Sequence, residues 1–131
     1  MARAGVQEDA GAPHIHPKLR VQVRGATVPV PANIGLGASH APMHTHEPDG
    51  VMHVEGAANP TLAQFMALWG VPLDGRRLGP HRADSREQVI MWVKAPGATG
   101  FKEQPVRPAL RLIDAQEVFL YYGPRAQVPI T

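Results

Sequence analysis

Proline and glycine recur along the whole chain, with 14 prolines and 13 glycines among 131 residues. Proline interrupts helices and is excluded from central strands, and glycine weakens the interior of both elements. Long uninterrupted helices are therefore excluded, and short elements joined by many turns are expected. A chain of 131 residues is also long enough to bury one hydrophobic core without disulfides. We predict a single α+β domain that is mostly β.

Composition excludes several classes of function. The chain has no cysteine, which excludes disulfides, thiolate zinc sites, iron–sulfur clusters and cysteine nucleophiles. A formal net charge of +2 and an aromatic content of 5% give neither the basic stripe nor the stacking surface of a nucleic-acid-binding protein. No apolar stretch approaches the length of a membrane span. We expect no nucleic-acid partner and a domain that does not span a membrane, and composition leaves the oligomeric state open.

The chain is predicted to divide into a short N-terminal segment and one domain. Residues 1–13 have no apolar periodicity, which predicts a flexible N-terminal segment before a single domain over residues 14–131. Strict alternation of apolar and polar residues over 19–24 predicts a strand with one buried face. A two-residue turn at Gly25-Ala26 would place Val21 opposite Val30, and prolines in the returning strand predict that it lies at the edge of a sheet.

One helix and two further strands are predicted downstream. The segment 61–70, TLAQFMALWG, has apolar residues at helical spacing and a terminal glycine, which predict a helix. It would begin either at a capping box of Thr61 and Gln64 or at Asn59, with Pro60 in the first turn. Residues 74–88 are polar and are predicted to be a solvated connection. Compact apolar runs at 89–93 and 118–122 predict strands. The resulting expectation is a β-grasp-like mixed sheet packed on one main helix.

Histidines are concentrated in the first part of the chain. Six of the seven precede residue 54, namely His14, His16, His40, His44, His46 and His53. In the segment 43–55, MHTHEPDGVMHVE, a loop over 47–50 would form a hairpin in which His44 lies opposite His53 and His46 opposite Val51. Because side chains alternate across a strand, the three histidines would then share one face with Glu55. Imidazoles so placed can converge on one metal ion.

The remaining candidates have more than one interpretation. His14 and His16 are two residues apart and precede the first strand, so they are further candidate ligands for this site or for a second one, or a solvated pair. Glu55 is a candidate ligand, although a carboxylate beside histidines is more typical of a group that orients an imidazole. His40 and His81 are interpreted as ordinary surface histidines.

Four strings in the first half of the chain carry a resemblance. HIHP, PANIG, MHTHEPDGVMHVE and TLAQFMALWG, all within residues 14–73, resemble a family of small bacterial proteins usually encoded with an N-terminal export or membrane-anchor segment. The resemblance implies an extracytoplasmic domain whose histidines act together, and it implies no activity. A cytoplasmic location is the alternative, since the chain lacks such a leader. A cupin also uses His-x-His, but the glutamate here follows His46 immediately, and the cupin spacing fails.

Three functional hypotheses follow. The first is a binding protein for a transition metal, with copper favoured and zinc or nickel as alternatives, that captures, buffers or delivers the ion and has a metal-delivery protein as partner. The second is a small zinc-dependent hydrolase or lyase with a three-histidine site. The third is a non-catalytic interaction domain whose histidines are incidental. Whether the chain is an enzyme stays open at this stage.

Overall fold

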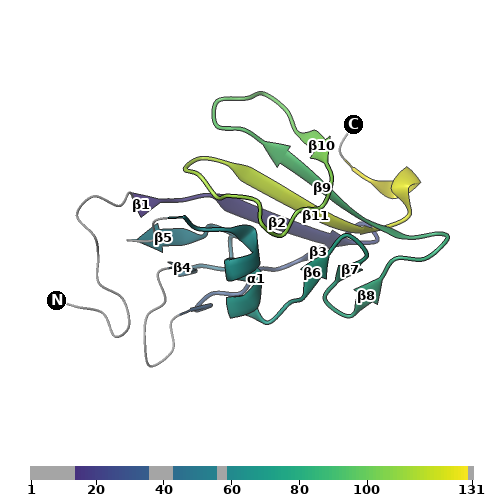
Figure 1. Ribbon diagram of the computed structural model, residues 1–131, viewed down its shortest axis with the longest axis horizontal. Helices are drawn as coiled ribbons and strands as arrows, with labels where there is room; N and C mark the ends of the chain where they lie inside the picture. The colour runs from purple at the N-terminus through teal and green to yellow at the C-terminus, as the bar shows by residue number, and fades with distance from the viewer. Residues whose placement is uncertain (1–13, 36–42, 56–58, 130–131) are drawn as a thin grey trace.

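The computed structural model describes residues 14–35, 43–55 and 59–129. The predicted flexible segment 1–13 and His40 lie outside these residues. The described elements are β1 (His14–Ile15), β2 (Lys18–Val23), β3 (Ala26–Val28), β4 (Met43–His44), β5 (His53–Glu55), α1 (Leu62–Trp69), β6 (Leu73–Asp74), β7 (Arg77–Leu78), β8 (His81–Arg82), β9 (Gln88–Lys94), β10 (Lys102–Gln104), β11 (Glu117–Gly123) and the 3-10 helix η1 (Arg125–Gln127) (Figure 1).

A mixed sheet forms the centre of the molecule. Within the described residues it has five strands in the order β10-β9-β11-β2-β3, in which β2 and β11 are parallel and the other pairs antiparallel. A first hairpin, β2–β3, is followed by α1 and then by β9 and β11, so that the first and last long strands run side by side (Figure 1). The prediction of a mostly β, β-grasp-like mixed sheet with one main helix is confirmed.

The first hairpin has a different register from the predicted one. Its turn residues are Arg24 and Gly25, with φ angles of 52° and 86°. Two successive left-handed residues give the turn whose twist matches that of the flanking strands. Val21 therefore pairs with Val28, and the predicted pairing of Val21 with Val30 is wrong. The prediction that β3 is an edge strand is confirmed.

The helix begins and ends as predicted. The Thr61 side chain accepts a hydrogen bond from the backbone N–H of Gln64, whose side chain accepts one from the Thr61 N–H. Gly70 follows in the left-handed conformation and closes the last turn. Phe65 is fully buried and packs in the core on one face of the main sheet. In the part of the chain that is described, no helix is long and apolar enough to cross a membrane.

Strands β9 and β11 of the main sheet are buried on both faces. The helix-side core takes Leu19 and Val21 from β2 together with apolar residues of α1, β9 and β11. A second cluster on the opposite face comprises Ile90, Trp92, Phe119 and Tyr121, with Phe101 and Val128 packed against it. Strands buried on two faces are apolar at successive positions, which explains the runs VIMWV and VFLYY in β9 and β11.

Residues 74–88 are more structured than the sequence predicts. β6, β7 and β8 form an antiparallel sheet that has three strands among the described residues. Leu78 is buried in the core, and the Tyr122 hydroxyl donates a hydrogen bond of 2.6 Å to the Arg82 carbonyl. Most residues of this segment are exposed, as predicted for a solvated connection, but it also forms three strands and buries Leu78 and Gly79. Each strand has two residues, too few to show an alternating pattern in the sequence.

Candidate metal centre

The histidines gather on a small sheet at one end of the molecule. The described residues form a three-stranded antiparallel sheet in the order β1-β5-β4, to the left of the main sheet in Figure 1. In the ladder between β4 and β5, His44 lies opposite His53, as predicted from the hairpin. On the other edge of β5, His14 lies opposite Glu55. Val51 forms a bridge to Lys18, so the loop end of the hairpin also pairs with the start of β2.

Alternation along these strands separates core residues from histidines. Met43, Met52 and Val54 are at most 2% exposed and join the helix-side core. The neighbouring positions in sequence, His44 and His53, therefore face the other side of the small sheet. The burial of these methionine and valine side chains stabilises the pairing register of β4 and β5. A shift of that register by one residue would exchange the buried face with the histidine face.

Four of the described histidines bring their rings together. The ring centroid of His53 lies 4.6 Å from that of His46, 4.9 Å from that of His16 and 5.9 Å from that of His44. The rings of His44 and His46 are 4.7 Å apart. His53 thus contacts the other three imidazoles. The structure brings together the three predicted ligands and one of the three further candidates, His16.

The other two candidates lie at the edge of this cluster. His14 is exposed and lies in the outer strand β1, two positions before His16 in the sequence. An oxygen of the Glu55 carboxylate lies 3.8 Å from Nε2 of His44. That position is beside an imidazole nitrogen and suits a carboxylate that orients the ring.

Three of the four ring spacings fit a shared ion, while the 5.9 Å between His44 and His53 and the present ring orientations do not. Imidazole nitrogens bind transition metals at about 2.0–2.1 Å, which sets ring centroids of neighbouring ligands roughly 4.5–5.3 Å apart. Across the described residues, no three His, Cys, Asp or Glu side chains form a group able to hold an ion as placed. The rings of His44 and His53 are nearly parallel, at 8°, so their in-plane lone pairs do not converge. Convergence on one ion therefore requires the rings to turn, and rotation about χ2, which is broad for histidine, is one way to turn them.

The cluster is buried on one side and open on the other. His44 is 2% exposed, His53 is half-buried, and His46 and His16 are exposed. An ion held by these rings would therefore rest on a protected ligand and keep exposed ligands towards solvent. This difference in exposure among the histidines suits a site that an ion can enter and leave.

Thr45 fixes the backbone between two of the histidines and was not predicted as a site residue. Its side-chain oxygen accepts a hydrogen bond of 3.0 Å from the Ile34 N–H and donates one of 2.7 Å to the Pro31 carbonyl. Its backbone carbonyl accepts from Asn33 at 2.9 Å, and its N–H donates to Ile34 at 3.0 Å. Thr45 is fully buried. The PANIG segment thus holds the strand that carries His44, and only the co-occurrence of the two motifs in the sequence signals this contact.

Burial lowers the pKa of His53 below its usual value, and the neighbouring imidazoles of His46, His16 and His44 lower it further, against an opposing effect of Asp49. The unfolded chain takes up this proton near pH 6.5, whereas the folded chain takes it up only at lower pH. The free energy of unfolding of the metal-free protein is therefore expected to decrease as the pH falls below about 6.5. Urea unfolding in chelator between pH 7.5 and 5.5 measures this decrease. His53→Gln should flatten it, and an equally steep decrease in that variant would contradict the assignment.

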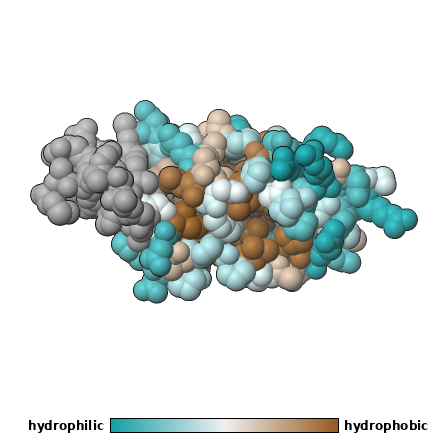
Figure 2. All heavy atoms as spheres, turned by 90° about the horizontal axis from the view of Figure 1, so that it is seen from below, coloured by the Kyte–Doolittle hydropathy of each residue, from teal (hydrophilic) through white to brown (hydrophobic). Residues whose placement is uncertain are grey.

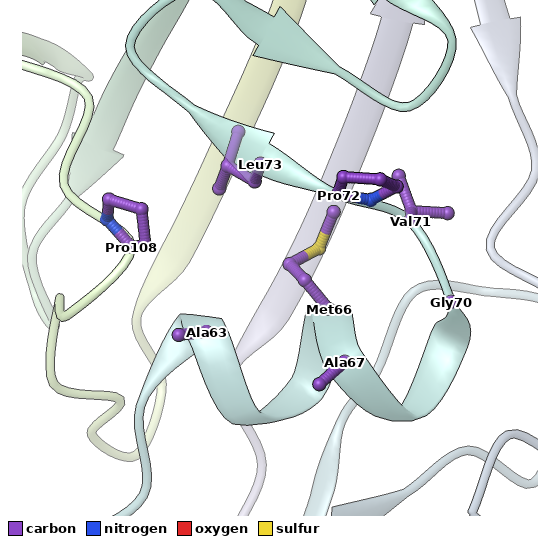
Figure 3. A pocket seen from close by; sticks show the side chains of 8 residues that line it. All are labelled: Ala63, Met66, Ala67, Gly70, Val71, Pro72, Leu73 and Pro108. Atoms are coloured by element: carbon purple, nitrogen blue, oxygen red, sulfur yellow. The ribbon is translucent and has the colours of Figure 1, made fainter.

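The groove beside the helix has no comparable chemistry. It has a volume of about 360 Å³ and is lined by Ala63, Met66, Ala67, Gly70, Val71, Pro72, Leu73 and Pro108 (Figure 3). None of these residues carries a titratable side chain. Figure 2 shows the molecule from below the view of Figure 1. Apolar residues form separate patches over the middle of this face, and hydrophilic residues gather at the end away from the grey atoms. Apart from the thioether of Met66, the groove therefore offers no side chain that binds a metal, and it offers no side chain for proton transfer.

Comparison with known proteins gives no relative for this chain. No protein-family model, no curated protein and no solved structure matches it. The proposal for its function therefore depends on the histidine geometry.

Proposed function

We propose that this protein binds a transition-metal ion, copper(II) in preference to zinc or nickel, through His44, His46 and His53, and that it serves metal capture, buffering or delivery. The observation that carries the proposal is the gathering of these three rings, with centroids 4.6–5.9 Å apart, on one side of a small sheet. Burial and the neighbouring imidazoles lower the pKa of His53, which favours its neutral form. Neutral imidazoles are the form that binds metal.

The donor set supports copper. The chain has no thiolate, so nitrogen and oxygen donors are those available around the cluster. Imidazole suits copper, zinc and nickel, and the general affinity order for divalent ions places copper(II) above the other two. A site made of imidazoles is thus expected to bind copper(II) most tightly and zinc as its nearest competitor.

Exposure supports a carrier over a structural metal site. Structural zinc sites are closed and four-coordinate. Here His46 is exposed while His44 is 2% exposed, so one side of the cluster meets solvent. The core of this domain also consists of apolar residues and does not include the clustered histidines. A metal-delivery partner and a location outside the cytoplasm stay predictions.

Metal analysis of untagged protein tests the proposal. Protein prepared without a histidine tag is titrated with copper(II) and with zinc against a chelator of known affinity, and its metal content as isolated is measured. We expect one tightly bound copper(II) ion per chain and weaker binding of zinc. His81→Ala, which removes a histidine that stacks on Tyr122 away from the cluster, is the control and should bind as the parent does. A parent that binds neither ion more tightly than the chelator would refute the proposal.

A further inference from the structure

Asp114 contacts His16, the one clustered histidine in the segment that follows β1. An oxygen of its carboxylate, Oδ1, accepts a hydrogen bond of 2.8 Å from the backbone N–H of His16. The same oxygen lies 3.9 Å from Nδ1 of the His16 ring. Both side chains are more than half exposed, at 51% for His16 and 61% for Asp114. The carboxylate thus holds the backbone of His16 and stands on the Nδ1 side of its imidazole.

The loop that carries Asp114 is anchored to the main sheet. Gln116 is 5% exposed, and its side-chain oxygen accepts a hydrogen bond of 3.3 Å from the Ile113 N–H. Its backbone carbonyl accepts one of 2.8 Å from the N–H of Lys18, which begins β2. His16 is two residues before Lys18. The loop and the strand are therefore joined at both Lys18 and His16, so Asp114 stands at a defined place beside the imidazole.

At 3.9 Å the Asp114 oxygen is too far to accept a hydrogen bond from Nδ1, but its negative charge favours the form of the ring with the proton on that nitrogen. Histidines that bind metals commonly donate their other ring N–H to a carboxylate, which fixes the tautomer and the ring orientation. With the proton on Nδ1, facing Asp114, the lone pair of His16 is on Nε2. The ring of His16 is also 4.9 Å from that of His53, within the spacing of two imidazoles on one ion. Position and tautomer both favour coordination.

We propose that His16 is a fourth ligand of the metal centre and that Asp114 is the residue that positions it. This inference rests on the proposed function, since it concerns the same ion. With His16 as a ligand, the metal centre takes ligands from both edges of the small sheet. β4 and the hairpin loop supply histidines at one edge, and the segment after β1 supplies His16 at the other. A carboxylate 98 residues away in the sequence then tunes the affinity.

The test uses Asp114→Asn, which keeps an oxygen to accept the His16 N–H and removes the charge beside the ring. We expect copper(II) affinity, measured by competition with a chelator, to fall about 10-fold, the lower end of the range for residues that orient a ligand. Asp74→Asn is the matched control. Asp74 also accepts a backbone N–H, that of Arg76 at 2.8 Å, but lies in the separate β6–β8 sheet, and this variant should bind as the parent does.

Electron paramagnetic resonance of the copper(II)-loaded protein gives a readout that a purely structural role would not change. His16→Ala removes a nitrogen donor, so its copper hyperfine splitting and nitrogen couplings are expected to differ from those of the parent. If His16→Ala and Asp114→Asn both keep the parent's affinity and spectrum, this inference is overturned and the three-histidine proposal stands. If the parent itself binds no copper(II), both are overturned.

Discussion

His53→Ala is expected to weaken copper(II) binding by at least about 100-fold, because even residues that merely orient a ligand contribute about 10- to 100-fold. His53 is the ring that contacts three other imidazoles, at 4.6, 4.9 and 5.9 Å. Removing it takes away one donor and the ring around which the other donors are arranged. Competition titration measures the loss, and circular dichroism confirms that the variant is folded.

The same titration on other single variants ranks the ligands. His44→Ala should match His53→Ala, since His44 is the most buried ring at 2% exposure. His16→Ala should lose less, since its side chain is 51% exposed and other donors or water can replace it. If His53→Ala binds copper(II) within about threefold of the parent, the imidazoles do not share an ion, and the bound copper lies elsewhere.

Gly50→Ala is expected to destabilise the protein by about 2–4 kcal/mol, combining the cost of overpacking with that of a left-handed residue. Gly50 has a φ of +80°, and a Cβ at this position would overlap the carbonyl oxygen of Leu19 in the neighbouring strand. That oxygen belongs to the backbone of the buried β2, so it has little freedom to move away. Urea unfolding, monitored by circular dichroism, measures the change in the free energy of unfolding.

Gly97→Ala separates the cost of overpacking from the cost of the left-handed conformation. Gly97 has a similar φ of +77°, but a Cβ there would meet nothing within 4 Å. This variant should lose only about 1 kcal/mol, the cost of the left-handed conformation. Equal losses at the two glycines would contradict the view that close approach to Leu19 is what requires glycine at position 50.

The Gly50 substitution should also reach the metal centre. The Gly50 carbonyl accepts a hydrogen bond of 2.8 Å from the Leu19 N–H, and the Met52 N–H donates one of 2.8 Å to the Pro17 carbonyl. These bonds hold the hairpin loop, and with it His46 and His53, against the start of β2. Copper(II) affinity is therefore expected to fall together with stability in Gly50→Ala and to stay at the parent level in Gly97→Ala.

Elements set by local chemistry were predictable from the sequence. The helix begins at the Thr61 capping box and ends at Gly70, and both signals lie within one turn of the residues they affect. The strands β9 and β11 follow from apolar runs. The first hairpin shows the limit of this approach, because a turn centred one residue earlier in the chain shifts the pairing partner of Val21 from Val30 to Val28.

The candidate site also has a part that could be predicted from the sequence and a part that could not. By itself the sequence determined that His44, His46 and His53 share one side of a hairpin, since alternation and a short loop decide which way strand side chains point. Only the tertiary structure decided that β1 lies on the far edge of β5, which brings His16 to His53 and Asp114 to His16. Periodicity records the face of a strand that is buried, but it carries no information on which distant strand becomes the neighbour. That choice follows from packing of the whole core.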